Sequence, residues 1–214
     1  MRIGVLLGGC GHYDGTDTHE AVLTLLALEA AGEKPVLLAP ALPQVRTVDH
    51  LDGSEVAGER RDVLRESARL VRGVVRRLGE YRPEFLEAII IPGGYGPVVN
   101  FSTGFAEKGR GRRVVGEVAV FLNHFLETRK PIGLVGLGEI PVRTLLGQAI
   151  EAPPAPRDPR HLRIDRGRRI VHTAGFAAFS RLADVLGGIE AMVGELLSMM
   201  AERGRAGGPA GEGE

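Results

Sequence analysis

The sequence predicts an α/β fold, in which a doubly wound parallel sheet carries helices on both faces as a three-layer sandwich. The first observation is a strand–helix–strand pattern within residues 1–40, because such a unit implies parallel strands joined by a right-handed crossover. The second is that two later apolar strand candidates also end in glycine-rich turns. The third is size, since 214 residues with 43% hydrophobic and 25% charged residues suit one such domain.

The first elements build the parallel unit. Residues 3–7 are an apolar run that ends in glycine, which indicates a buried strand. Residues 18–31 carry apolar side chains at helical spacing and stop before a glycine, so we expect a helix there. Residues 34–40 form the second strand. Residues 47–56 predict a hairpin, because Asp52-Gly53 separates two short strand-like runs.

The middle of the chain continues the alternation. Residues 59–72 show an apolar helical face, and residues 88–92 form the most hydrophobic strand. A helix over 116–128 leads to a further central strand over 131–135 and a short helix over 141–148.

The last third starts with an irregular, proline-rich loop at residues 151–161. Residues 162–173 predict a second hairpin, and Ser180 is a candidate N-cap for a long final helix. We therefore expect one domain over residues 1–203 and a disordered glycine-rich tail over residues 204–214.

Composition excludes several classes of function. Lys and Arg number 27, as do Asp and Glu, so the zero net charge gives no electrostatic reason to expect nucleic acid or an anionic membrane. The arginine-rich helix near residue 65 is interpreted as a solvated face paired with Glu59 and Glu66. The single Cys rules out an internal disulfide and a multi-cysteine metal site. No apolar run approaches the roughly 18 residues of a membrane span, and the N-terminus resembles a first strand rather than a signal peptide. These features favour a cytoplasmic protein.

Three loops lie at expected carboxyl ends of strands, where ligands bind in parallel α/β sheets: residues 8–20, 93–101 and 136–140. The first is dense in titratable groups, which either cap the next helix or form a site. Glu20 would lie in the first turn of that helix, where the dipole favours its charged form and burial opposes it. A metal site using His12, His19 and Glu20 is a weaker alternative, because the spacing matches no standard motif. The titratable groups of this loop are Cys10, His12, Tyr13, Asp14, Asp17, His19 and Glu20.

The other two loops offer backbone rather than side-chain chemistry. Gly93, Gly94 and Gly96, interrupted by Tyr95, could present N–H groups to a ligand oxygen as an oxyanion hole, or could simply make the turn. The loop is not a P-loop, because no Gly-Lys-Ser/Thr follows. The third loop resembles a nucleophile elbow, but Gly136 supplies no Ser or Cys there.

Three motifs carry a resemblance to a known family: Gly8-Gly9-Cys10-Gly11-His12-Tyr13-Asp14-Gly15, His19-Glu20-Ala21-Val22 and Ile91-Pro92-Gly93-Gly94-Tyr95-Gly96. Together they resemble the ElbB-like family, also called isoprenoid-biosynthesis or lycopene-enhancing proteins, of the ThiJ/PfpI superfamily. The likeness covers residues 1–150 and returns at 164–197. It implies a flavodoxin-like, class I glutamine amidotransferase-like fold.

The resemblance also implies roles by position. Glu20 matches the glutamate beside the family's elbow cysteine, and that cysteine falls at Gly136, so the nucleophile is absent. Gly93, Gly94 and Leu137 match backbone donors of the oxyanion site. Glycine adopts the strained elbow conformation without steric cost, so the turn is kept while covalent chemistry at that position is lost.

Three functions follow for comparison. The first is a binding or regulatory protein for a small molecule, with a pocket lined by His12, Tyr13, Asp14 and Tyr95 and no covalent catalysis. The second is a cofactor-independent, glyoxalase-like enzyme for small carbonyl compounds, with Glu20 as general base and Cys10 as a possible thiol. The third, a glutaminase, needs a Cys–His pair that the elbow does not provide. We expect no cofactor and no metal, and the resemblance implies a homodimer.

Overall fold

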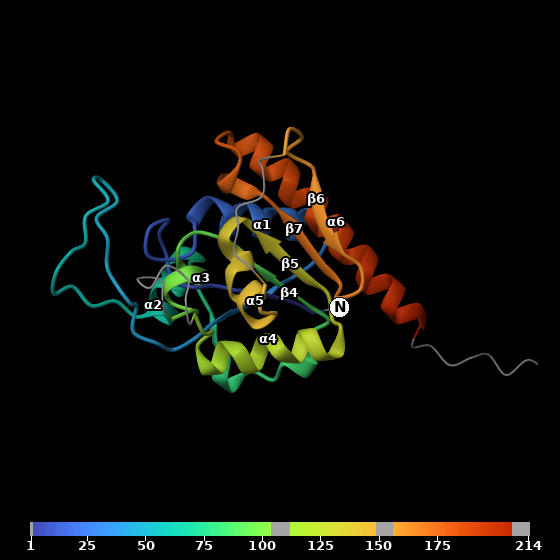
Figure 1. Ribbon diagram of the computed structural model, residues 1–214, viewed down its shortest axis with the longest axis horizontal. Coiled ribbons are helices and arrows are strands. Elements are labelled where there is room, and N and C mark those ends of the chain that lie inside the picture. The colour runs from blue at the N-terminus through green and yellow to red at the C-terminus, as the bar shows by residue number, and fades with distance from the viewer. Residues whose placement is uncertain (1, 104–111, 149–155, 207–214) are drawn as a thin grey trace, which may run out of the picture.

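A single sheet organises the computed structural model, which describes residues 2–103, 112–148 and 156–206 (Figure 1). Among these residues the sheet has seven strands in the order β3-β2-β1-β4-β5-β7-β6, and all neighbours are parallel except β6 and β7. The predicted α/β fold is confirmed. The strands are β1 (Ile3–Leu6), β2 (Val36–Ala39), β3 (Arg76–Arg77), β4 (Ala88–Ile91), β5 (Ile132–Val135), β6 (Leu162–Asp165) and β7 (Ile170–Thr173).

Helices cover both faces of this sheet, which completes the three layers. Helices α1 and α6 pack together on one face, and α4 and α5 lie on the other (Figure 1). The α-helices are α1 (Thr18–Ala30), α2 (Val63–Leu70), α3 (Gly96–Val99), α4 (Gly116–Thr128), α5 (Glu139–Leu145) and α6 (Leu182–Ala206). In the described ranges four 3₁₀ turns accompany them, namely η1 (Leu78–Glu80), η2 (Pro83–Phe85), η4 (Gly136–Gly138) and η5 (Gly175–Ala177).

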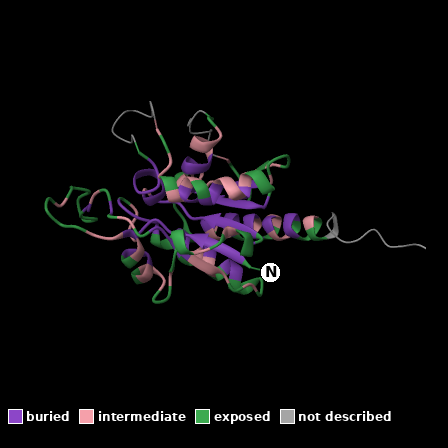
Figure 2. Ribbon diagram, turned by 90° about the horizontal axis from the view of Figure 1, so that it is seen from below, coloured by how far each residue is buried: buried purple, intermediate pink, exposed green. Residues whose placement is uncertain are grey.

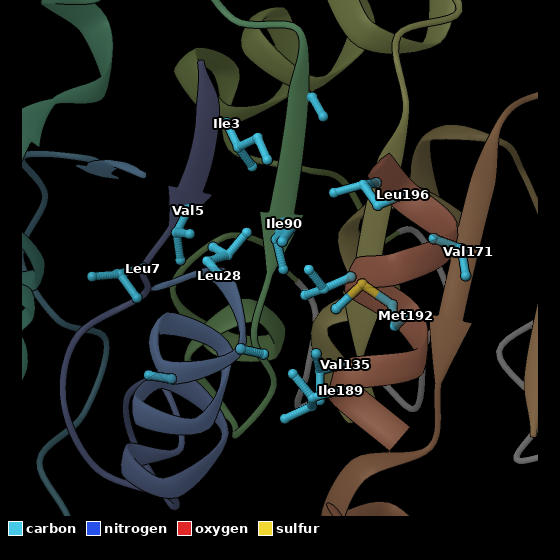
Figure 3. Packing of buried hydrophobic residues seen from close by; sticks show 14 of the residues in the cluster. Ile3, Val5, Leu7, Leu28, Ile90, Val135, Val171, Ile189, Met192 and Leu196 are labelled. Carbon is cyan, nitrogen blue, oxygen red and sulfur yellow. The ribbon is translucent and has the colours of Figure 1, made fainter. Parts of the chain in front are cut away.

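The central strands are buried on both faces, and β4 illustrates the rule. Ile90 packs into the core under α1 and α6, whereas Ile89 and Ile91 pack into the core under α4. Figure 3 shows the first core, where Leu28 of α1 and Met192 of α6 approach the sheet. The buried strands form the middle layer in Figure 2. Continuous apolar runs are therefore the correct sequence signature for these strands.

The strand order reverses between β1 and β4. Strand β1 pairs with β2 on one side and β4 on the other, so successive crossovers leave this point in opposite directions. A crevice opens at the carboxyl ends of strands at such a switch point. The loops after β1 and β4 meet there.

Several elements differ from the sequence prediction. The turn over 47–56 forms at Asp52-Gly53, but its arms share only an isolated bridge between Val48 and Glu55, and this segment projects from the body (Figure 1). Helix α2 begins at residue 63 instead of 59, because the Asp62 side chain caps it by accepting from the Arg65 N–H.

The carboxyl-terminal third also differs in detail. The predicted hairpin of β6 and β7 is present and extends the main sheet rather than standing apart from it. Helix α6 starts after Arg181 rather than directly after Ser180, and it continues to Ala206, past the expected start of the tail. Residues 207–214, and residues 151–155 of the proline-rich loop, lie outside the described residues.

Two arginines in and just before α2 pair with the expected glutamates. Arg61 lies 2.7 Å from Glu59, and Arg69 lies 3.1 Å from Glu66. Within the described ranges, no helix combines the length and hydropathy that crossing a membrane requires.

The one buried lysine among the described residues, Lys130, stabilises the segment that precedes β4. Lys130 is 6% exposed, and its Nζ donates to the carbonyl oxygens of Pro83, Glu84 and Leu86. We expect Lys130→Met to reduce the free energy of unfolding by about 2 kcal/mol, because buried carbonyl groups lose a charged donor. Chemical denaturation measures this. The exposed Lys34→Met variant should stay within about 0.5 kcal/mol of wild type, and equal losses in both variants would contradict the expectation.

Candidate active site

Glu20 lies at the centre of the candidate site. It occupies the first turn of α1, which Asp17 caps: Asp17 Oδ1 accepts from the N–H groups of His19 and Glu20. The Asp17 N–H in turn donates to the carbonyl oxygen of Gly93 at 3.0 Å. This docking directs Glu20 toward the ends of the central strands, where its side chain is only 2% exposed.

Two backbone N–H groups hold the Glu20 carboxylate. Oε2 accepts from Gly93 at 2.8 Å, and Oε1 accepts from Phe176 at 2.8 Å. Gly93 follows β4 and Phe176 follows β7, so one side chain joins helix α1 to two strand ends. Satisfying both oxygens is what makes burial of this carboxyl group tolerable.

Glycine occupies two positions next to the Glu20 carboxylate, because a larger residue would not fit there. A Cβ atom added at Gly93 would lie 2.4 Å from Oε2, and one at Gly175 would lie 2.3 Å from Oε1. Both distances are shorter than real Cβ atoms show, so side chains at these two positions would displace Glu20.

Gly136 forms the elbow between β5 and α5. Its φ of +49° lies in the left-handed region, and the 3₁₀ turn η4 leads directly into α5. A Cβ atom at this position would lie 3.0 Å from Glu20 Oε1 and 3.4 Å from the Ala174 carbonyl oxygen. The elbow therefore directs its side-chain position at the Glu20 carboxyl group, where the family's thiol is expected and this chain has only hydrogen.

Burial raises the pKa of Glu20 from 4.5 to about 7. The nearby charge of Asp17 also raises the pKa, whereas the hydrogen bonds from Phe176 and Gly93 lower it. Desolvation is the largest of these effects, so burial decides between the opposing influences that the sequence left open. A carboxyl group with a pKa near neutrality can both give and take a proton at physiological pH.

Some of the predicted backbone N–H donors already form hydrogen bonds within the protein, and others do not. The Gly93 N–H donates to Glu20, which differs from the expectation that it faces a ligand oxygen. The N–H groups of Tyr95 and Gly96 donate to the carbonyl oxygens of His12 and Gly15. Outside regular helix and strand bonding, no hydrogen bond between described residues uses the N–H of Gly94 or Leu137.

The loop after β1 brings the predicted pocket residues together at its surface. The ring of His12 lies 5.0 Å from that of Tyr13 and 5.7 Å from that of Tyr95. His12 Nδ1 also lies 3.0 Å from Asp17 Oδ2. Asp14 is instead fully buried, and its Oδ2 accepts from the Val48 N–H, so it fastens the projecting segment rather than facing the site.

Cys10 faces α2. The groups that shift its pKa are Thr18, Glu66, Arg69 and Asp14, and Glu20 is not among them. Burial is the largest effect and raises the pKa of the thiol, which favours the protonated form over the nucleophilic thiolate.

The candidate metal ligands His12, His19 and Glu20 have other surroundings. No group of three or more His, Cys, Asp or Glu side chains there is arranged to hold a metal ion. His12 pairs with Asp17, His19 is exposed, and both Glu20 oxygens accept backbone hydrogen bonds.

Sequence reasoning missed the contribution of the loop after β7. Gly175, Phe176 and the buried His172 all border the elbow, and His172 Nε2 lies 3.1 Å from the Gly136 carbonyl oxygen. Only the topology could have indicated this contribution. Strand β7 is parallel to β5, so the carboxyl ends of both strands lie at the same edge of the sheet. Asn100 was also missed, and its side-chain amide donates to the carbonyl oxygens of Gly8 and Asp14.

A scan against protein-family models finds no match. Among curated proteins, the chain is 31% identical to the mitochondrial ES1 protein homolog of Rattus norvegicus, over 92% of this chain and 84% of the rat protein. It is 42% identical to the human mitochondrial glutamine amidotransferase-like class 1 domain-containing protein 3, over 62% of this chain. That match spans only 49% of the human protein's own length.

Solved structures agree. An isoprenoid biosynthesis protein with an amidotransferase-like domain from Ehrlichia chaffeensis superposes with a TM-score of 0.83 at 30% identity, over 92% of this chain and 99% of that one. A ThiJ/PfpI domain protein from Brachyspira murdochii shares the fold alone, with a TM-score of 0.50, 14% identity, and coverage of 92% and 96%.

The fold and the strand-end site together define a member of the ThiJ/PfpI, class I glutamine amidotransferase-like superfamily. Within that superfamily, the chain belongs to the family of the ES1 proteins.

The predicted cytoplasmic location is contradicted by these relatives. The human and rat proteins, and the Danio rerio ES1 protein that is 34% identical over 65% of this chain and 53% of its own length, are mitochondrial by name. The prediction rested on a buried first strand, and a strand has the same physical requirements in every compartment.

The raised pKa of Glu20 predicts a pH-dependent stability. The folded state retains the proton more strongly than the unfolded state, so the free energy of unfolding falls as pH rises from 4.5 through about 7. Relative to Glu20→Gln, wild type should lose about 3 kcal/mol between about pH 4 and about pH 8. Denaturant titrations across this range measure the difference. Glu29→Gln, exposed on the same helix, is the control, and a Glu20→Gln difference that stays constant with pH would contradict the shifted pKa.

Proposed function

We propose that this protein is a binding or regulatory protein. It binds a small carbonyl compound at the Gly136 elbow, next to the Glu20 side chain, without forming a covalent bond to it. The observation that carries the proposal is the position of Gly136. Its absent side chain would point at Glu20 Oε1 from 3.0 Å, so the place of a nucleophile is retained while the nucleophile is missing.

The remaining groups suit recognition of a carbonyl oxygen. The N–H groups of Gly94 and Leu137 are the candidate donors, since Gly93 is engaged with Glu20. A protonated Glu20 adds a third donor, which its pKa of about 7 makes available at neutral pH. Tyr95 and His12 would line the outer part of the pocket.

Two finer assignments belong to the same proposal. The chain is ElbB-like within its family, which its opening motif and the named isoprenoid biosynthesis protein from Ehrlichia chaffeensis support. The chain also forms a homodimer, as the resemblance implies, and sedimentation of the full chain tests this.

A glyoxalase-like enzyme is the second candidate function. The pKa of Glu20 favours it, because a base of about 7 can remove a proton next to a carbonyl group. The elbow argues against an enzyme, because forming the hemithioacetal intermediate requires a thiol beside the base and Gly136 has none. Cys10 does not replace that thiol, since burial raises its pKa.

Hydroxyacetone is a suitable probe for binding. We expect it to shift the backbone amide signals of Gly94 and Leu137 in nitrogen-15 spectra and to leave the intact mass unchanged after dilution. Glu20→Gln should weaken binding about tenfold, because an amide replaces the buried carboxyl group that donates a hydrogen bond to the ligand. Cys10→Ser should bind as wild type does. Unshifted amides, or a persistent mass increase on any side chain, would contradict non-covalent binding.

Restoring the thiol tests the meaning of Gly136. In a Cys10→Ser background, Gly136→Cys places the only thiol beside Glu20, and the carboxylate needs to shift by only a few tenths of an ångström. We expect alkylation of this thiol by iodoacetamide and formation of lactate from methylglyoxal at least about tenfold above the Cys10→Ser background. Wild type should form none above the buffer rate. Wild-type turnover that Glu20→Gln abolishes would instead establish the enzyme.

A further inference from the structure

A cavity lies beside the elbow, between α5, β6 and β7. Its volume is about 230 Å³, which is below the range of drug-sized pockets and suits a molecule of amino-acid size. Five of its eleven lining residues form an aliphatic wall, and the other six are polar, Arg143 and Gln148 among them. The residues of that wall are Leu134, Val142, Leu146, Ile164 and Ile170.

A polar network closes one end of this cavity. Arg163 Nη2 donates to Glu139 Oε2 at 2.6 Å, and Arg163 Nε donates to His172 Nδ1 at 3.2 Å. His172 Nε2 lies 3.1 Å from the Gly136 carbonyl oxygen, which can only accept. His172 is therefore the neutral tautomer with its proton on Nε2. Burial lowers the pKa of His172 to about 4, in agreement with this assignment.

One donor and one acceptor of the network stay open. Among the described residues, Arg163 Nη1 makes no hydrogen bond, although the Arg163 side chain is 36% exposed and lines the cavity. Glu139 Oε2 accepts from both Arg143 and Arg163, whereas Glu139 Oε1 accepts from no described residue and is not among the solvent-shielded polar atoms. Arg163 and Glu139 thus form an ion pair beside the aliphatic wall, and each keeps one atom, Nη1 and Oε1, without a hydrogen bond to the described residues.

We propose that this cavity binds a small aliphatic α-amino acid as its zwitterion, with the carboxylate on Arg163, the ammonium group on Glu139 and the side chain against the aliphatic wall. The planar guanidinium group matches a carboxylate, and a carboxylate such as that of Glu139 matches an ammonium group. This site is separate from the proposed carbonyl site, and it does not depend on that function.

Other ligand classes fit less well. A plain carboxylate would meet Arg163, and Arg143 lines the same cavity, but it would leave Glu139 Oε1 without a donor. A plain amine would face the guanidinium group of Arg163. A phosphate dianion would meet Arg143 and Arg163 but also two acidic side chains, Glu139 and Asp165, of which Asp165 is paired with Arg168 at 2.9 Å. The zwitterion satisfies both open groups at once.

Calorimetric titration with L-valine tests the proposal on the full chain. Isovalerate lacks the ammonium group of valine, and isobutylamine lacks its carboxylate, so each should bind at least about tenfold more weakly. Arg163→Gln and Glu139→Gln should each weaken valine binding about tenfold. Arg166→Gln is the matched control, because Arg166 lies on the same hairpin, pairs with Glu195 and does not line the cavity.

The two variants also give a readout that a merely structural effect would not produce. Arg163→Gln should abolish the preference for valine over isobutylamine, and Glu139→Gln should abolish the preference for valine over isovalerate. Absence of valine binding to wild type, equal binding of valine and isovalerate, tighter binding of inorganic phosphate than of valine, or unchanged binding in Arg163→Gln would each overturn the proposal.

Discussion

The buried carboxyl group of Glu20 is the interaction on which the site depends. Its two oxygens accept from Gly93 and Phe176, so a single side chain of α1 fixes the ends of β4 and β7 relative to each other. The arrangement requires glycine at positions 93 and 175, because a side chain at either would occupy the carboxylate's own space. It also sets the chemistry of the turn, since the burial that makes the contact is what raises the pKa of the acid.

Much of the fold was predictable because its signals are local. The apolar run at residues 88–91 and the helix over residues 116–128 are set by patterning within a few residues, and both lie where the sequence placed them. Glu20 and Gly136 were also identifiable, through motif and position. The partners of Glu20 were not, because Phe176 is 156 residues away along the chain and contributes only its backbone N–H. A backbone donor leaves no signature in the residue type, and the engagement of Gly93 was hidden for the same reason.

Gly136 separates two properties that a cysteine at an elbow combines. The left-handed conformation with φ of +49° costs a non-glycine residue about 1–3 kcal/mol, which relatives with a reactive thiol would have to offset. With glycine the turn loses that strain and the nucleophile together. The proposed donors, the N–H groups of Gly94 and Leu137, and the acid are not supplied by a side chain at position 136, so the proposed recognition of a small oxygen-bearing molecule does not require covalent chemistry.

The elbow also lies between two buried titratable groups whose pKa values move in opposite directions. Gly136 directs its side-chain position at Glu20 and its carbonyl oxygen at His172. Burial raises the pKa of Glu20 to about 7 and lowers that of His172 to about 4, so between these values both groups are neutral. The His172 contribution to stability is lost as pH falls from 6.5 through about 4, and the Glu20 contribution is lost as pH rises from 4.5 through about 7. Because these losses oppose each other, the turn is most stable when neither group is charged. Above about pH 7, Glu20 gains a negative charge beside the open donors, which disfavours a carbonyl oxygen at the position where the proposed ligand binds.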